Sequence, residues 1–242
     1  MQAVLFDFNG TLFDDTRFHM RAWQKYMREK FDLEFTREEV RRNFIGPNNT
    51  TIFRNCFGDR YREEELRAFS REKEAYYRAA AREEGALHLI EGAPELFDLL
   101  MERRIPFALA TASKLDNVNF YLEDLGLKKW FTMERIVYDQ GLLPSKPNPA
   151  FYLEAARRVH CSVDACVVAE DSPSGIQAAI NAGAGRVIAE DSITGIGAAI
   201  NAGAGRIVAI DRSVSREWLE ERKNSGEIHA IVHDFCGFER FL

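Results

Sequence analysis

The chain has 242 residues, a formal net charge of −6, and 46% hydrophobic and 29% charged residues. Its length is sufficient for a sizeable folded core, and its apolar content argues against an intrinsically disordered protein. No lysine- or arginine-rich stretch stands apart from acidic neighbours, so neither nucleic acid nor an anionic membrane surface is expected as a partner.

Membrane and secretory signals are not expected either. No apolar run approaches the 18 residues that a membrane-spanning helix needs, and no basic region of a signal peptide precedes the first apolar run. The four cysteines are widely spaced and form no CxxC pair, which is typical of reduced, structural thiols. They are Cys56, Cys161, Cys166 and Cys236. We therefore expect a cytoplasmic protein.

The first part of the chain predicts one strand followed by a set of helices. The strand is expected over Ala3–Phe6, and residues 16–84 contain only helical patterns. Thr36 and Glu39 have the spacing of a capping box, which marks the start of a helix. The helices are expected at Thr16–Lys30, from Thr36, near Thr50 and at Glu63–Glu84.

Through the rest of the chain, short apolar runs alternate with helical patterns. This alternation is typical of a parallel sheet covered by helices on both faces. Further strands are expected at Pro106–Ala110, Arg135–Tyr138, Ala165–Ala169, Arg186–Ala189, Arg206–Ile210 and Ala230–Val232. The sequence therefore predicts an α/β fold with a doubly wound parallel sheet, a core of residues 1–14 and 85–242, and an inserted helical domain of residues 15–84.

One segment of the chain is duplicated. Residues 169–188, AEDSPSGIQAAINAGAGRVI, recur as residues 189–208, AEDSITGIGAAINAGAGRIV, with 15 of 20 positions identical. A period of 20 corresponds to one strand end, turn and helix, and two copies are too few for a solenoid. We expect the extra βα step to be accommodated at the edge of the sheet, where an added right-handed crossover obstructs nothing.

Residues suited to phosphate chemistry occur at strand ends. Asp7 follows the first strand, Thr111 the second, and the pair Glu170 and Asp171 a later one, while Lys146 precedes a helix. In an open parallel sheet, ligands bind beyond the carboxyl ends of the strands. Each residue alone has an ordinary explanation, as a helix cap or a surface lysine. Their order and shared context favour phosphoryl transfer.

The chemistry of phosphoryl transfer explains this combination of residue types. A carboxylate can attack phosphorus to form an acyl phosphate, but a phosphate dianion repels it unless a metal ion and an ammonium group neutralise the charge. Mg²⁺ prefers oxygen ligands and keeps several waters, so two acids from different strand ends suffice to hold it. Thr111 and the backbone N–H groups around it would hold the remaining phosphate oxygens.

Four short motifs carry a resemblance to a known family. The segments DFNGT, LATASK, SKPNP and EDSPSGIQAA resemble the four motifs of the haloacid dehalogenase (HAD) superfamily. In particular, they resemble the subgroup of β-phosphoglucomutase and its phosphatase relatives, in which a helical cap follows the first motif. The resemblance covers essentially the whole chain, including FHMRAW at residues 18–23. It implies a Rossmann-like core, Mg²⁺, a small phosphorylated substrate, and a monomer or weak dimer.

The resemblance also implies roles for individual residues. Asp7 would be the nucleophile, Thr111 would bind the phosphoryl group, and Lys146 would offset the charge of both. Mg²⁺ would be held by the Asp7 carboxylate, the backbone carbonyl of Asn9 and Asp171, with Glu170 beside it. Substrate-binding positions of phosphoglucomutases, two in the core and two in the cap, are matched by Ser113, Lys114, His19 and Lys73.

The duplication offers two candidates for the metal-binding acid. The first copy, with Asp171, follows the family pattern better than the second copy, with Asp191. We expect Asp191 to lie one strand further along the sheet, displaced by about 4.8 Å and too far away to replace Asp171.

Two positions depart from the family pattern. Asn9 stands where the family has a second aspartate, which protonates the leaving oxygen and then activates water. An amide cannot do this, and general acid–base help is typically worth about 10²–10⁴-fold in rate. Asn49 stands where phosphoglucomutases carry a phosphate-binding arginine, and a neutral amide lacks the bidentate phosphate contact.

Several functions remain open on this basis. The leading hypothesis is a Mg²⁺-dependent phosphohydrolase that forms an aspartyl phosphate on Asp7 and turns over slowly because of Asn9. A phosphoglucomutase-type phosphotransferase is weakened at both Asn9 and Asn49. A protein that binds phosphorylated metabolites with little turnover is favoured by Asn9 alone. Phosphonate cleavage through a Schiff base would require a cap lysine, for which Lys73 is the candidate.

Overall fold

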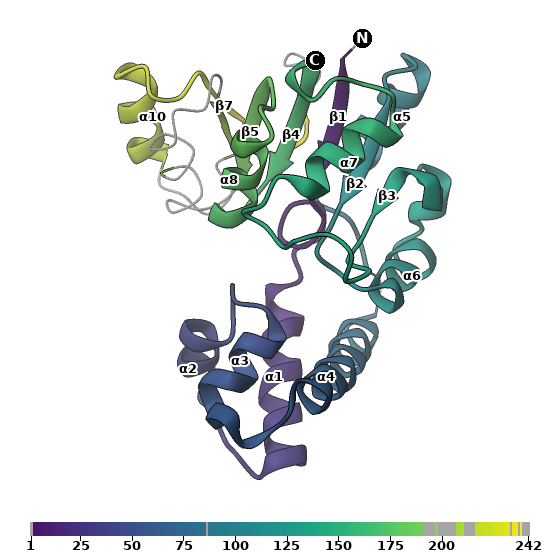
Figure 1. The fold of residues 1–242 in the computed structure, drawn as a ribbon. Helices are drawn as coiled ribbons and strands as arrows, with labels where there is room; N and C mark the ends of the chain where they lie inside the picture. The colour runs from purple at the N-terminus through teal and green to yellow at the C-terminus, as the bar shows by residue number, and fades with distance from the viewer. Residues whose placement is uncertain are drawn as a thin grey trace. The chain divides into compact units, whose positions relative to one another are not determined.

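The computed structural model describes residues 2–85, 87–190, 197, 207–210, 216–232, 234–236 and 238 (Figure 1). The chain divides into two compact units, one of residues 1–14 and 88–242 and the other of residues 15–87. Most of the second copy of the duplicated segment, including Asp191, lies outside the described residues. Among the described residues, no helix is both long and apolar enough to cross a membrane.

The first unit is built on a seven-stranded parallel sheet, which confirms the predicted fold class. The strand order is β3-β2-β1-β4-β5-β6-β7 (Figure 1). The strands are β1 (Ala3–Phe6), β2 (Phe107–Ala110), β3 (Ile136–Val137), β4 (Cys166–Glu170), β5 (Arg186–Glu190), β6 (Ile207–Ile210) and β7 (Ala230–Val232). Each expected strand is present, with ends that differ by one residue at most.

Helices cover both faces of this sheet. The helices of the unit are α5 (Ala93–Glu102), α6 (Leu115–Asp124), α7 (Ala150–Arg158), α8 (Pro173–Asn181) and α10 (Arg216–Asn224), with short 3₁₀ turns at η2 (Leu127–Lys129), η3 (Met133–Arg135) and η4 (Val163–Ala165). Alternate residues of β1 point to opposite faces. Leu5 shares a core cluster with residues of α7 and α8, whereas Phe6 packs edge-to-face on Phe97 of α5. Every residue of β1 is therefore buried.

The order of the strands creates a switch point beside β1. The chain runs from β1 to β2 and β3 on one side, and then returns to β4 on the other side of β1. Phe6 is paired with Leu109 of β2 and with Ala169 of β4, so the residues that follow these three strands emerge at one edge of the sheet. This edge is where ligands bind in open parallel sheets.

The second unit is a helical domain with its own core. Its elements are α1 (Thr16–Phe31), α2 (Arg37–Asn43), α3 (Asn49–Phe57), η1 (Gly58–Arg60) and α4 (Glu63–Glu83). Trp23 and Phe53 pack edge-to-face within a buried aromatic cluster. The expected capping box is present: the Thr36 hydroxyl accepts from the Glu39 amide, and the Glu39 carboxylate accepts from the Thr36 amide.

The duplicated segment adds a strand inside the sheet, which corrects the expectation of an edge position. β7 is the edge strand, and β6 and β5 lie one and two positions in from it. Val187 of β5 is paired with Ile207 of β6, and Ile188 with Val208, so equivalent positions of the two copies lie opposite each other. The two strands are similar, with Val187 and Ile188 in β5 opposite Ile207 and Val208 in β6, and β6 pairs with β7 where β5 would otherwise pair with it.

This register predicts that one copy can be removed. Deletion of residues 189–208 joins Ile188 to Ala209 and restores a strand that continues the pairing of β6 with β7. We expect the shortened chain to fold cooperatively, with a free energy of unfolding within about 2 kcal/mol of the full chain. Urea unfolding followed by circular dichroism measures this difference.

Deletion of residues 169–188 provides a matched control, because its product differs from the first at only five positions. One of them places Gly197 where the first product has Gln177, inside α8. Glycine within a helix is unfavourable by about 1 kcal/mol, so this product should be the less stable of the two. Aggregation of both products would contradict the proposed interchangeability of the copies.

Candidate functional site

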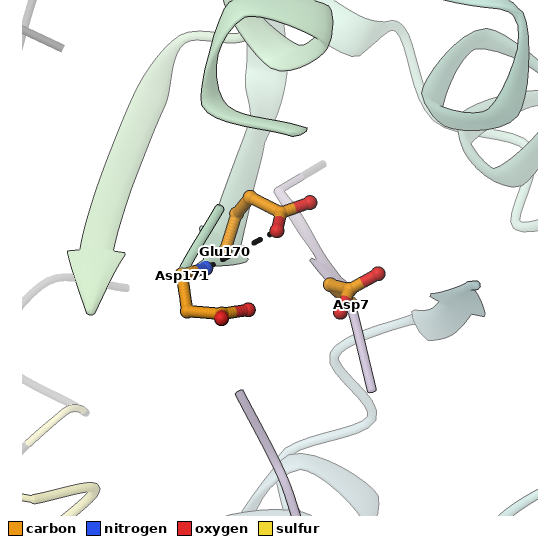
Figure 2. Close-up of side chains that lie close together, drawn as sticks. All are labelled: Asp7, Glu170 and Asp171. Carbon is orange, nitrogen blue, oxygen red and sulfur yellow. Dashed lines mark hydrogen bonds between the residues drawn. The ribbon is translucent and has the colours of Figure 1, made fainter. Parts of the chain in front are cut away.

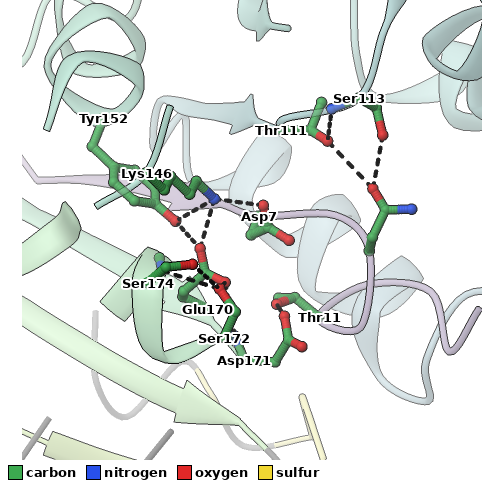
Figure 3. Close-up of polar contacts among 12 residues, drawn as sticks. Asp7, Thr11, Thr111, Ser113, Lys146, Tyr152, Glu170, Asp171, Ser172 and Ser174 are labelled. Atoms are coloured by element: carbon green, nitrogen blue, oxygen red, sulfur yellow. Dashed lines mark hydrogen bonds and ion pairs between the residues drawn. The ribbon is translucent and has the colours of Figure 1, made fainter. Parts of the chain in front are cut away.

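A buried lysine joins two carboxylates at the switch point. Asp7 follows β1 directly, and Glu170 is the last residue of β4. The ammonium of Lys146 donates to Asp7 Oδ1 and to Glu170 Oε2, each at 2.6 Å (Figure 3). The side chain of Lys146 is 7% exposed and that of Glu170 is 1% exposed. The structure therefore brings together three residues that lie far apart in the sequence.

Glu170 accepts hydrogen bonds at both of its oxygens. Tyr152, on α7, donates its hydroxyl to Oε2 at 2.6 Å (Figure 3). Ser172 donates its amide and its hydroxyl to Oε1 at 3.0 and 2.9 Å. Gly175 is required here, because a Cβ at this position would lie 1.7 Å from Glu170 Oε2. Tyr152 was not predicted from the sequence, although it lies in the first turn of the helix that follows SKPNP.

Asp171 completes a group of three acids. Its Oδ1 accepts from the hydroxyl of Thr11 at 2.9 Å, another contact that the sequence did not reveal. Gly10 has a positive φ of 83°, and a Cβ on it would lie 2.2 Å from Asp171 Oδ2. Carboxylate oxygens of Asp7, Glu170 and Asp171 lie within 4.8 Å of one another (Figure 2).

The charges of this group are unbalanced. Burial, and then the charge of Glu170, raise the pKa of Asp7 to about 7, against the lowering effect of Lys146. Burial and the charges of Glu170 and Asp7 also raise the pKa of Asp171. Burial opposes ionisation of Glu170 too, but Lys146, Tyr152 and the Ser172 amide together hold its pKa below the usual value. Three carboxylates facing one ammonium fit a divalent cation that prefers oxygen ligands.

A second set of polar contacts surrounds Asn9. The hydroxyl of Ser113 donates to Asn9 Oδ1 at 2.9 Å, and the Asn9 amide donates to the Tyr121 hydroxyl at 2.9 Å. The Thr111 hydroxyl lies 3.4 Å from Asn9 Oδ1 and accepts from the Ser113 amide at 3.1 Å (Figure 3). Tyr121, on α6, was also not identified from the sequence.

Two expected phosphate contacts of this region have partners within the protein. The Thr111 amide donates to the carbonyl of Val137 at 2.9 Å, which extends the pairing of β2 with β3. The Ser113 amide donates to the Thr111 hydroxyl, and phosphate binding by the N–H groups around Thr111 stays a prediction. Lys114 forms an ion pair with Asp139 at 2.6 Å, and its side chain is 58% exposed.

The three remaining predicted residues lie in the helical unit. The ammonium of Lys73 lies 2.7 Å from His19 Nδ1 and donates to Glu74 Oε1 at 3.0 Å. Asn49 donates to the same glutamate oxygen at 2.8 Å. Lys73 is 1% exposed and lies 5.0 Å from the centre of the Trp23 ring. Lys73 and Asn49 thus share the Glu74 carboxylate, and His19 contacts Lys73.

His19 is held on its other side by an acid and an aromatic ring. Its ring stacks on Tyr77 with centroids 4.0 Å apart, and Nε2 lies 3.4 Å from Asp15 Oδ2. Tyr77 donates its hydroxyl to the same Asp15 oxygen at 2.8 Å. Asp15 and Tyr77 thus contact the His19 ring at Nε2 and on its face, whereas Lys73 contacts it at Nδ1.

We predict that Lys146→Met destabilises the fold strongly. It would leave the buried carboxylates of Asp7 and Glu170 without their ammonium, and breaking a buried ion pair typically costs about 3–5 kcal/mol. Urea unfolding at pH 7.5 in EDTA measures the loss. Lys129→Met is the control, because Lys129 forms an exposed pair with Asp98 and such pairs contribute little. Equal losses of unfolding free energy in the two variants would contradict the conclusion that Asp7 and Glu170 depend on Lys146 as their buried partner.

We also predict how stability varies with pH in EDTA. The folded pKa of Asp7, about 7, lies above its unfolded value, so the folded state binds more protons between about pH 4 and 7. The contribution of Asp7 to stability is therefore present at low pH and is lost as the pH rises through 7, by about 2–4 kcal/mol. Mg²⁺ should restore stability at pH 7.5 and have little effect at pH 5. A metal-free curve that rises across this window would contradict the Asp7 shift.

Known proteins that are similar to this chain are hydrolases and a mutase of the haloacid dehalogenase type. The family model for haloacid dehalogenase-like hydrolases matches residues 1–183. The chain is 28% identical over 199 residues to a phosphorylated carbohydrates phosphatase of Thermotoga maritima, covering 77% of this chain and 84% of the relative. It is also 28% identical over 187 residues to β-phosphoglucomutase of Bacillus subtilis, covering 76% and 80%.

A solved structure extends the similarity to the whole chain. A HAD hydrolase of family IA, variant 3, from Entamoeba histolytica matches with a TM-score of 0.78 and 27% identity, covering 98% of this chain and 95% of that one. These matches confirm the resemblance that the four motifs indicated, including its β-phosphoglucomutase-like character. The chain belongs to the haloacid dehalogenase-like hydrolase family.

Proposed function

We propose that this chain is a Mg²⁺-dependent phosphohydrolase that acts on a small phosphorylated metabolite through an aspartyl phosphate on Asp7. The observation that carries the proposal is the position of the Asp7 carboxylate, which lies 2.6 Å from the Lys146 ammonium at the switch point of the sheet. The phosphatase relative acts, by its name, on phosphorylated carbohydrates, which supports a sugar-phosphate-like substrate here.

The proposed reaction has two steps at phosphorus. Asp7 attacks the phosphoryl group, so that a bond forms between its carboxylate oxygen and phosphorus while the bond to the leaving oxygen breaks. Water then attacks the phosphorus of this acyl phosphate, which releases inorganic phosphate and restores Asp7. Lys146 offsets the charge that repels the dianion from the carboxylate.

The donor set suits Mg²⁺, and its members divide into two roles. Asp7, Asp171 and the backbone carbonyl of Asn9 would hold the ion, which supplies neutralisation of the transferring phosphoryl group when bound. Both oxygens of Glu170 already accept hydrogen bonds, from Tyr152 and Ser172 among others. We therefore assign Glu170 mainly to holding Lys146 in place beside the ion.

Asn9 determines how the leaving group departs. The amide has no proton to give to an alkoxide near neutral pH, so the leaving oxygen must depart unprotonated or take its proton from elsewhere. Thr111 and Ser113 direct their hydroxyls toward the Asn9 side chain and also lie at the proposed phosphoryl-binding end of β2. We expect slow turnover of alkyl phosphates and faster turnover of esters with acidic leaving groups.

We further propose that the two compact units are a catalytic core and a cap. In this proposal residues 1–14 and 88–242 carry the chemistry, and residues 15–87 select the substrate. The buried ammonium of Lys73, with His19 and Asn49 nearby, is the feature of the second unit that supports a role in substrate binding. Lys114 is a further candidate for substrate contact.

Two other functions have less support. Asn49 is neutral and is bonded to Glu74, so it does not provide the phosphate-binding charge of a phosphoglucomutase. A protein that binds phosphometabolites with little turnover is favoured by Asn9 but not by the complete set of Asp7, Lys146 and Asp171. Phosphate-release assays separate it from an enzyme.

We predict Mg²⁺-dependent release of phosphate from p-nitrophenyl phosphate and from sugar phosphates. Asp7→Asn should abolish release, whereas Asp98→Asn, at an exposed ion pair in the same unit, should leave it unchanged. Loss of activity in both variants, or in neither, would contradict the assignment of Asp7.

The identity of the leaving group gives a second readout in the same assay. Across a series of aryl and alkyl phosphates, kcat/KM of the parent should fall steeply as the basicity of the leaving group rises. Asn9→Asp should flatten this dependence and raise alkyl phosphate turnover by about 10²-fold or more. Activity that is seen only in Asn9→Asp, with phosphate binding intact in the parent, would favour the binding protein.

A further inference from the structure

Asn9 contacts the hydroxyls of Thr111, Ser113 and Tyr121, and its contacts with the last two close a ring. The Tyr121 oxygen also lies 3.2 Å from Asn9 Oδ1, which is longer than its 2.9 Å contact with the amide nitrogen. The Asn9 amide nitrogen lies 2.9 Å from the Tyr121 oxygen, the Tyr121 and Ser113 oxygens lie 2.8 Å apart, and the Ser113 oxygen lies 2.9 Å from Asn9 Oδ1. Three side chains from three segments thus meet pairwise at hydrogen-bond distance. The proposed reaction uses Asp7, Lys146 and Asp171 and gives Tyr121 no role.

An amide satisfies all three contacts in one direction around this ring. Asn9 donates to Tyr121, Tyr121 donates to Ser113, and Ser113 donates to Asn9 Oδ1. Within the ring each group then gives one hydrogen and accepts one, which an amide and two hydroxyls can supply. The ring therefore needs a donor as well as an acceptor at position 9.

An ionised carboxylate at position 9 would not satisfy the same ring. It has only acceptors, so the hydrogens of Tyr121 and Ser113 would both turn toward it. The two hydroxyl oxygens, 2.8 Å apart, would then face each other without a hydrogen between them. One of the three contacts would have to break, and buried polar atoms that lose partners are destabilising.

Tyr121 has little freedom to relieve this conflict. It is 1% exposed, and its ring stacks on Phe8 with centroids 4.0 Å apart. Phe8 immediately precedes Asn9, so the stack ties the tyrosine to the same turn that carries the amide. Movement of the hydroxyl away from position 9 would disturb this buried stack.

We propose that Tyr121 is a positioning residue that, together with Ser113, closes a hydrogen-bond ring matched to an amide at position 9. The ring fixes the orientation of the Asn9 side chain and disfavours an ionised acid in its place. The Asn9 amide is then supported by neighbouring residues of this chain that suit an amide better than an ionised aspartate. The consequence for catalysis rests on the proposed phosphohydrolase function. In that function, a ring that holds an amide at position 9 favours leaving groups that depart without a proton.

Side-chain NMR tests the positioning role directly. In ¹⁵N-labelled protein, the Asn9 amide signals are identified by their loss in Asn9→Asp. We expect Tyr121→Phe to speed exchange of these hydrogens with solvent by roughly fivefold, the effect of losing one ordinary hydrogen bond. Tyr26→Phe removes a buried tyrosine hydroxyl in the helical unit, bonded to Glu72, and should leave the exchange rate unchanged. Unaltered exchange in Tyr121→Phe would overturn the proposal.

A double-mutant cycle tests the match between amide and tyrosine. We expect Asn9→Asp to lower the thermal unfolding midpoint by about 3 °C more in the parent than in the Tyr121→Phe background. Equal shifts in the two backgrounds would overturn the proposal. Where Tyr121→Phe does not fold, Ser113→Ala opens the ring at its other hydroxyl and should show the same coupling. Neither measurement uses phosphate release, so failure of the ring proposal can be told apart from failure of the proposed function.

Discussion

The ammonium of Lys146, 2.6 Å from both Asp7 and Glu170, is the interaction on which the rest of the site depends. Charges removed from water are tolerated only when they are paired and hydrogen-bonded. Lys146 meets this condition with two carboxylates and the hydroxyl of Tyr152. Glu170 meets it with a different set of donors on each oxygen, which explains why a buried acid keeps its charge while the pKa of Asp7 rises.

The backbone around this pair is shaped to let the acids approach. At Gly10 and at Gly175 the space of a Cβ is taken by the carboxylates of Asp171 and Glu170. Gly10 lies in the turn that follows β1, and Gly175 lies in the first turn of α8, which follows β4. Gly10 therefore leaves room for Asp171 of the other motif, whereas Gly175 leaves room for Glu170 of its own motif. The approach of Asp171 to Gly10 links two segments about 160 residues apart, as the Thr11–Asp171 hydrogen bond also does.

The sequence was informative wherever one physical pattern dominated. Fully apolar runs such as Ala3–Phe6 predicted strand positions, and Thr36 with Glu39 predicted the start of α2. It was less informative where the partner comes from elsewhere in the fold. Tyr152 and Tyr121 are helix aromatics whose rings suit any core, and only the tertiary structure shows that their hydroxyls reach Glu170 and Asn9. The edge position expected for the duplication was wrong because β7 pairs with β6 and takes the edge itself. The order of strands in a sheet depends on such pairings between strands, which the linear pattern of apolar residues does not show.

The duplication and the amide at position 9 are two independent differences from the family pattern. The structure explains why both are compatible with the fold. Asp7, Lys146, Glu170 and Asp171 come from the end of β1, the segment before α7 and the end of β4. Gly175, which leaves room for Glu170, lies within the first copy of the duplicated segment. β6 enters the sheet on the far side of β5, so the pairing of β1 with β2 and β4 does not depend on it. Asn9 lies on the opposite flank, where its contacts come from the end of β2 and from α6. A strand added toward β7 therefore leaves untouched the hydroxyls that hold the amide, and each departure acts on its own part of the fold.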